Sequence, residues 1–252
     1  MDTSSFLEVL THPSFYLAVI ASVLLGIAKS GIKGIAVLIV TLLALVYGAR
    51  ESTGILMPLL IVGDIFAIIY YNRFTRWNHI IKMIPWTIVG VLIGVFYGYS
   101  IDENSFRIGM AIIILLSVFV MYYWDRKKNK TVPKHWSFAG LIGITAGFTT
   151  MIGNLAGAFA NIYFLAQKLP KNEFIGTAAW LFFIINIFKL PFHFFVWETI
   201  NLKSFNISLM LIPFVALGLF IGIKLVKKIN ENTYRKLILL FTALGALVIF
   251  FI

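Results

Sequence analysis

The stretch Glu103-Asn104-Ser105-Phe106-Arg107 recurs as Glu231-Asn232-Thr233-Tyr234-Arg235, and residues 103 and 231 are 128 positions apart. A proline and two glycines recur at the same offset, as Pro85-x4-Gly90-x3-Gly94 and Pro213-x4-Gly218-x3-Gly222. A repeat at one fixed offset that spans half a chain indicates two copies of one structural unit. The sequence therefore predicts a duplicated fold.

The composition places this duplicated chain in a membrane. Hydrophobic residues make up 60% of the 252 residues and charged residues only 12%, whereas a soluble domain has about 25% charged residues. Apolar runs near the ~20 residues that cross a bilayer recur along the chain. The net charge of +11 comes from cations in short loops between these runs, which is typical of membrane topology. We expect a lipid bilayer as partner and no nucleic acid.

Apolar runs divide the chain into ten segments. Three earlier positions recur at an offset of 122: Gly31 and Gly153, Gly54 and Gly176, Asp64 and Asn186. This pattern predicts an all-α integral membrane protein with about 8–10 transmembrane segments. The segments are 13–28, 31–47, 52–71, 80–99, 105–123, 137–151, 154–168, 173–195, 207–226 and 233–252.

Loop charges predict the topology. The basic loop 125–134 is expected in the cytoplasm by the positive-inside rule, which places the acidic loop 100–104 and both termini outside. Five segments per half, an odd number, make the second copy enter the membrane upside down. We expect two inverted-topology repeats, residues 1–123 and 137–252, joined by a cytoplasmic linker at 124–136.

Catalytic and metal-binding patterns are absent from the sequence. There are no cysteines, and the four histidines are widely spaced, so neither a thiolate site nor a histidine pair can be identified. No Lys or Arg precedes Lys29, so the first apolar segment lacks the basic start of a signal peptide and is expected to stay in the mature protein. We expect no cofactor, no metal and no enzymatic activity.

The first two segments of each half are short and meet at glycine-rich junctions. The first junction is Lys29-Ser30-Gly31-Ile32-Lys33-Gly34. A helix break here would expose backbone N–H groups with partial positive charge, and two lysines add full charge. Lys29, Ser30, Gly31, Lys33 and Gly34 are therefore candidate ligands for a small anion. The alternative is a short cytoplasmic loop whose lysines only set topology.

The mirror junction in the second half is uncharged. It offers Thr150, Gly153, Asn154 and Gly157 as further substrate-binding candidates, with Asn161 four residues after Gly157. The amide of Asn154 either donates to an anion or caps the helix that follows. Glycines on either side would let the backbone approach the ligand closely.

Asp64 is the carboxylate expected deepest in the membrane, about two-thirds along its segment. A carboxylate at that depth is costly and is a functional candidate by default. Asp64 either takes up a proton during transport or forms a static ion pair with Lys29, Lys33 or Lys189. Its repeat partner Asn186 is polar but cannot titrate.

A polar stripe follows Asn186 at helical spacing. Lys189 and His193 lie three and seven residues after it, so all three face one side of a regular helix. The stripe either lines the transport path or packs against polar backbone. We take Asp64, Asn186, Lys189 and His193 as candidates for coupling or for the path.

The chain resembles the TauE/SafE sulfite-exporter family, also called the toluene-sulfonate uptake permease family, over nearly its whole length. The resemblance lies in the size, the two-fold repeat and the glycine-rich breaks at 26–34 and 147–157, with 49–54 echoed at 172–177. It implies export or uptake of small sulfur-containing or organic anions across a prokaryotic inner membrane.

The expected function is secondary transport of such an anion by alternating access, with the site between the two junctions. A passive anion channel or uniporter is the main alternative, and a membrane-embedded enzyme is less favoured. A small anionic substrate is the expected partner, and a homodimer is left open.

Overall fold

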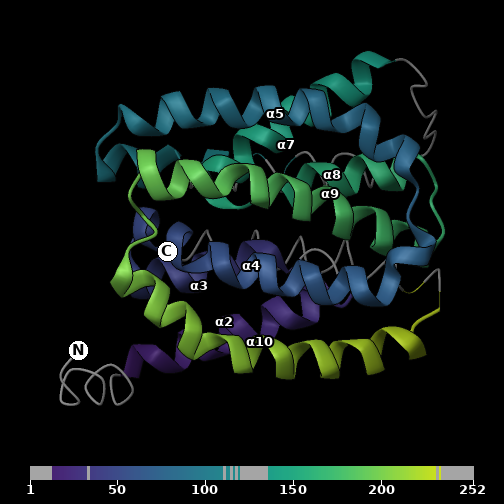
Figure 1. Ribbon diagram of the computed structural model, residues 1–252, viewed down its shortest axis with the longest axis horizontal. Coiled ribbons are helices and arrows are strands. Elements are labelled where there is room, and N and C mark those ends of the chain that lie inside the picture. Colours follow the sequence, from purple (N-terminus) through teal and green to yellow (C-terminus); the bar gives the residue numbers. More distant parts are fainter. Residues whose placement is uncertain are drawn as a thin grey trace.

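The secondary structure of the described residues is helical and contains no strand. The computed structural model describes residues 13–32, 35–109, 112, 113, 116, 119, 136–230 and 233. The long helices lie side by side along the longest axis of the molecule (Figure 1). In chain order the elements are α2 (Pro13–Lys29), α3 (Ala36–Tyr47), α4 (Ala49–Tyr71), η1 (Asn72–Phe74), α5 (Trp77–Tyr99), α7 (Trp136–Gly153), α8 (Ala156–Ala166), α9 (Lys171–Pro191), η2 (Phe192–Val196) and α10 (Leu202–Lys228).

Five of these helices are long and apolar enough to cross a membrane: Ala49–Phe74, Trp77–Tyr99, Trp136–Gly153, Lys171–Val196 and Leu202–Lys228. Two shorter apolar helices, Phe15–Lys29 and Ala36–Tyr47, precede them. Large apolar side chains such as Ile69, Phe96 and Phe220 are exposed on the helix surfaces, as expected where lipid and not water is the solvent. The expectation of an all-α membrane protein is confirmed.

Helix breaks occur at both predicted junctions. α2 ends at Lys29, and Gly31 has a φ of 133°, a conformation that favours glycine. A Cβ on Gly31 would also lie 2.6 Å from Cδ1 of Ile175. In the second half α7 ends at Gly153, and Asn154 has a φ of 56°. The helix after the first break begins at Ala36, later than the expected start at residue 31.

The two halves pack on each other through a repeated pattern of contacts. α5 of the first half packs on α7 of the second, and α10 of the second packs on α2 of the first. A Cβ on Gly90 would lie 2.0 Å from the carbonyl oxygen of Ile144, and one on Gly218 would lie 2.0 Å from that of Val23. Gly90 and Gly218 are equivalent in the sequence repeat, so the close helix contact occurs once in each half. Between these pairs, α4 packs against α9.

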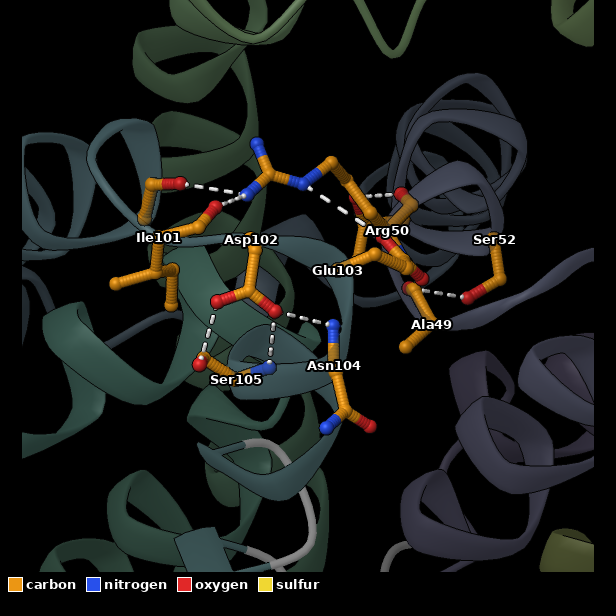
Figure 2. A network of polar contacts seen from close by, with 10 residues as sticks. Ala49, Arg50, Ser52, Ile101, Asp102, Glu103, Asn104 and Ser105 are labelled. Atoms are coloured by element: carbon orange, nitrogen blue, oxygen red, sulfur yellow. Dashed lines mark hydrogen bonds and ion pairs between the residues drawn. The ribbon is translucent and has the colours of Figure 1, made fainter.

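A capping hydrogen bond recurs at the repeated motif in each half. Oδ1 of Asp102 accepts hydrogen bonds from the backbone N–H groups of Asn104 at 2.9 Å and Ser105 at 3.0 Å, and Oδ2 accepts one from the Ser105 hydroxyl at 2.7 Å (Figure 2). These bonds, with the Ser105 hydroxyl first, hold the pKa of Asp102 below its usual value. At the equivalent position, Oδ1 of Asn230 accepts from the N–H of Thr233 at 2.8 Å. The repeat thus preserves a helix cap.

Arg50 fixes one end of the bundle, at the start of α4. Its Nη2 donates to the carbonyl oxygens of Gly98 at 2.9 Å and Ile101 at 2.6 Å, and its Nε lies 3.7 Å from Oε2 of Glu103 (Figure 2). The guanidinium also lies 4.9 Å from the ring centroid of Phe106. Arg50 therefore joins α4 to the end of α5 and to the capped helix that follows.

The helix contact at Gly90 yields a stability prediction. We expect Gly90→Ala to lower the free energy of unfolding by about 1–3 kcal/mol, because the new methyl group meets a backbone carbonyl that cannot move aside without separating α5 from α7. Thermal unfolding of the purified protein in detergent measures the change. Gly109→Ala is the matched control, because no heavy atom of the described residues lies within 4 Å of the place that its new Cβ would take. Equal effects of the two substitutions would contradict the close-contact explanation.

Candidate functional site

A cavity of about 70 Å³ lies between the two helix breaks. Ala36, the first residue of α3, lines it together with Ala156 and Gly157, the first two residues of α8. Among the described residues, neither helix has a side-chain hydrogen bond at its N-cap. The first backbone N–H groups therefore bring partial positive charge to the cavity wall. The space is enough for a few water molecules or one small ligand.

A buried ion pair lies beside this cavity. Nζ of Lys29 donates to Oδ1 of Asp64 at 2.5 Å, and Nδ2 of Asn186 donates to Oδ2 at 2.7 Å. Lys29 is 6% exposed and Asp64 is fully buried. The contacts connect α2, α4 and α9, so they join the break in the first half to the central helix of each half. Asp64 and Asn186 are repeat equivalents, and they meet where α4 packs on α9.

A second buried lysine reaches the break in the other half. Nζ of Lys189 donates to Oδ1 of Asn154 at 2.6 Å and to the hydroxyl of Thr150 at 3.2 Å. Lys189 is fully buried. The sequence left open whether Asn154 caps α8, and the structure decides against it: the N-cap is Leu155 without a side-chain cap, and Oδ1 of Asn154 accepts from Lys189.

Cations outnumber carboxylates around the cavity. Lys29 and Lys189 are both buried, and in the part of the chain that the structure describes Asp64 is the only buried acidic side chain. An ammonium group far from water is costly unless an opposite charge or hydrogen bonds compensate it. Lys189 has neutral partners in Asn154 and Thr150. The site therefore holds two buried basic side chains and one buried acidic side chain.

The structure brings seven of the predicted residues together. Five of them line the cavity, and two are hydrogen-bonded to lining residues. The lining residues are Lys29, Thr150, Asn154, Gly157 and Asn186, and the two behind them are Asp64 and Lys189.

Other predicted residues lie away from the cavity wall. The hydroxyl of Ser30 donates to the carbonyl oxygen of Ile27, and this side chain packs where a Cβ on Gly222 would lie 2.0 Å from its oxygen. Gly31 supplies the turn conformation described above, and Gly153 ends α7 as a buried residue. Ser30 and Gly31 therefore serve helix packing and the break itself. Lys33 and Gly34 lie outside the described residues.

His193 is buried like Asn186 and Lys189, but it does not line the cavity. It lies in the π-helical turn η2 after Pro191, where the wider turn changes the helical register. Its Nδ1 is 2.9 Å from the hydroxyl of Thr199, and its ring packs against Trp197. His193 thus follows Asn186 and Lys189 into the bundle interior, where its contacts are with Thr199 and Trp197.

Asn161 and Phe182 also line the cavity, beside several aliphatic side chains. Asn161 lines the cavity one helical turn after Gly157, so the spacing within α8 was a usable signal. Phe182 also lines it, and Nζ of Lys29 lies 5.6 Å from the centroid of its ring. Nothing in the sequence distinguished Phe182 among 24 phenylalanines.

Metal-ligand clusters are not found in the described ranges, in which no three His, Cys, Asp or Glu side chains come together. The donors around the cavity are ammonium, amide, hydroxyl and backbone N–H groups. This donor set suits an anion, because nearly every group it presents can donate a hydrogen bond.

Comparison with known families gives one match. A family model described as Sulfite exporter TauE/SafE matches residues 17–249, nearly the whole chain. Searches of curated proteins and of solved structures give no match. The family resemblance drawn from the glycine-rich breaks and the repeat is confirmed.

The buried ion pair yields a second prediction. We expect Lys29→Met to lower the free energy of unfolding by about 3–5 kcal/mol, because it leaves the Asp64 carboxylate buried without its cation. The double variant Lys29→Met/Asp64→Leu should recover most of this loss, since it removes both charges. Denaturant unfolding in detergent measures all three proteins.

Lys203→Met is the control for this prediction. Lys203 pairs with Glu51 at 3.1 Å but is 68% exposed, so its loss should cost less than about 1 kcal/mol. If Lys29→Met/Asp64→Leu were as unstable as Lys29→Met, packing and not charge would account for the lost free energy of unfolding.

Proposed function

The chain belongs to the TauE/SafE sulfite-exporter family of membrane transporters, and from this premise we propose that it carries a small sulfur-containing or organic anion by alternating access. The substrate binds in the cavity between the two helix breaks. The observation that carries this proposal is the excess of buried basic side chains there, two lysines against one carboxylate. An anion of one negative charge would neutralise the site.

Three kinds of donor hold the anion. Lys29 and Lys189 supply charge, the amide of Asn154 and the hydroxyl of Thr150 supply hydrogen bonds, and the N-termini of α3 and α8 supply aligned backbone dipoles. Anions bind readily at helix N-termini for the last of these reasons. Broken helices whose N-termini meet an anionic group near the middle of a membrane are a recurrent feature of secondary transporters.

Asp64 couples transport to protons. Its carboxylate engages Lys29, so the lysine is only partly available to a substrate while Asp64 is ionised. A proton on Asp64 neutralises the carboxylate and leaves the full charge of Lys29 for the anion. Anion binding and proton uptake then favour each other, which is the thermodynamic requirement for co-transport.

Alternating access is supported by the repeated packing and by ion pairs at the two ends. Glu51 at the start of α4 pairs with Lys203 at the start of α10, and Glu173 at the start of α9 pairs with Arg76 before α5. α4 has 23 residues between these points, about 35 Å of helix, so the pairs lie at opposite ends. Rocking of one half against the other would open one end while the pair at the other end stays closed.

The charges at these two ends of the bundle predict the orientation in the membrane. Arg73, Arg76 and Lys227 share one end, since Lys227 lies over the ring of Tyr70 at 5.6 Å. Asp102 and Glu103 lie at the other end, beside Arg50. We place the basic end in the cytoplasm of a prokaryotic cell and the acidic end outside the inner membrane. The repeats at 1–123 and 137–252 are then inverted with respect to each other.

The substrate site is tested by removing the buried charge. We expect Lys189→Met to weaken anion binding roughly ten- to a hundredfold, the loss of one charge-assisted hydrogen bond. Calorimetry with sulfite, thiosulfate, sulfoacetate, taurine and short carboxylates measures affinity, and uptake into proteoliposomes measures transport. Lys224→Met, which removes an exposed lysine with no role in the proposed mechanism, should bind like the wild-type protein. Wild-type affinity in Lys189→Met would exclude this lysine from the site.

The coupling role is tested with Asp64→Asn. The amide retains the size of the carboxylate but cannot carry a proton, so anion binding should persist while the dependence of uptake on a pH gradient disappears. Uptake into liposomes with and without a pH gradient measures this. A gradient response equal to wild type would leave Asp64 as a structural partner of Lys29. Wild-type flux that ignores the pH gradient would favour a uniporter or channel.

A further inference from the structure

Each half of the chain gives one long helix to the other half. α10 of the second half packs against α2 and α4 of the first, and α5 of the first half packs against α7 and α9 of the second. The crossings are close: a Cβ on Gly54 of α4 would lie 2.1 Å from the carbonyl oxygen of Thr199, and one on Gly176 of α9 would lie 2.6 Å from that of Tyr71. Gly54 and Gly176 are equivalent in the sequence repeat, so the chain crosses once in each direction.

The exchange divides the described helices into two packing units. The first unit contains α2, α3, α4 and α10, and the second contains α5, α7, α8 and α9, with α4 and α9 in contact between them. The ion pair Glu51–Lys203 lies within the first unit, and Glu173–Arg76 lies within the second, because Arg76 directly precedes α5. These pairs therefore hold each exchanged helix in its new unit and stay closed when the units move.

Arg50 joins the two packing units at the acidic end of the bundle. It lies in α4 of the first unit, and its Nη2 donates to the carbonyl oxygens of Gly98 and Ile101 at the end of α5, in the second unit (Figure 2). The last carbonyls of a helix have no partner within the helix and carry partial negative charge, which a nearby cation stabilises. This contact must break before the first turn of α4 can move away from α5.

Lys171 makes the equivalent contact at the basic end, in the opposite direction. It is the first residue of α9 in the second unit, and its Nζ donates to the carbonyl oxygens of Val226 at 3.2 Å and Ile229 at 2.6 Å, at the end of α10 in the first unit. Val226 and Ile229 follow Gly98 and Ile101 by 128 residues, the offset of the repeated motif. Cations at the starts of two equivalent helices thus bind equivalent carbonyls.

We propose that Arg50 and Lys171 are latches between the two packing units, with Arg50 at the outer entrance to the cavity and Lys171 at the inner entrance. The inference rests on the proposed function, because it names the contacts that alternating access must break. Both latches are closed in this structure. Release of Arg50 lets the units separate at the outer end while Lys171 keeps the inner end closed, and release of Lys171 does the reverse.

The test measures from which side of the membrane the cavity can be reached. The chain has no cysteine, so Ala156→Cys on the buried cavity wall introduces a single thiol. A membrane-impermeant thiosulfonate is added to sealed right-side-out or inside-out vesicles, and the labelling rate is measured. In this background Arg50→Met should raise the rate from outside by about tenfold, the effect of one lost charge-assisted hydrogen bond on the population of the open state. Lys171→Met should raise the rate from inside, and neither variant should raise the rate from the other side.

Arg107→Met and Lys224→Met are the matched controls. Arg107 is exposed in the helical turn that follows Ile101, and Lys224 is exposed in the last turns of α10, so both substitutions should leave the two rates unchanged. Arg50→Lys and Lys171→Arg retain a cation at each latch and should label more slowly than the methionine variants.

Unchanged rates in both methionine variants overturn the inference, and so does an equal rise from both sides, which is the result of general loosening. If Arg50→Met does not fold, the rates of Lys171→Met from the two sides decide by the same criteria. The labelling needs no substrate. Failure of every anion in the panel to bind would therefore overturn the proposed substrate without changing these rates.

Discussion

Asp64 accepts hydrogen bonds from Lys29 and Asn186 in the interior of the bundle, and this contact fixes the arrangement of three helices. A buried carboxylate is stable only if its charge is compensated close by, so α2, α4 and α9 must keep the relative positions that allow both bonds. The cavity lies directly beside this contact. The requirement to compensate one buried charge thus positions the wall of the candidate site.

Close helix packing allows the helices to adopt this arrangement. Gly90 and Gly218 let α5 approach α7 and α10 approach α2 until backbone meets backbone. In a membrane, where apolar side chains gain little by leaving lipid, such close contact is a main source of helix association. Because both contacts are outside the α4–α9 pair, they hold the two helix breaks toward each other without filling the space between them.

The site is asymmetric although the packing is repeated. Lys29 meets a carboxylate, whereas Lys189 meets the neutral groups of Asn154 and Thr150. Asp64 and Asn186 are equivalent positions with different charge. This difference places a buried carboxylate in the first half and leaves Lys189 of the second half with uncharged partners. In the proposed mechanism Asp64 of the first half couples transport to protons, and both halves contribute groups to the anion site.

Local sequence determined the helices, the two breaks and the repeat, because apolar runs, glycines and capping residues act within a few positions of the chain. It also identified Asp64 from its depth in an apolar segment, and Lys29 and Asn154 from the glycine-rich junctions. Only the tertiary structure decided their partners. Lys29 and Asp64 are 35 residues apart, and Asp64 and Asn186 are 122 apart, so their pairing depends on helix packing that no local pattern encodes. The π-helical turn that contains His193 was likewise seen only in the tertiary structure.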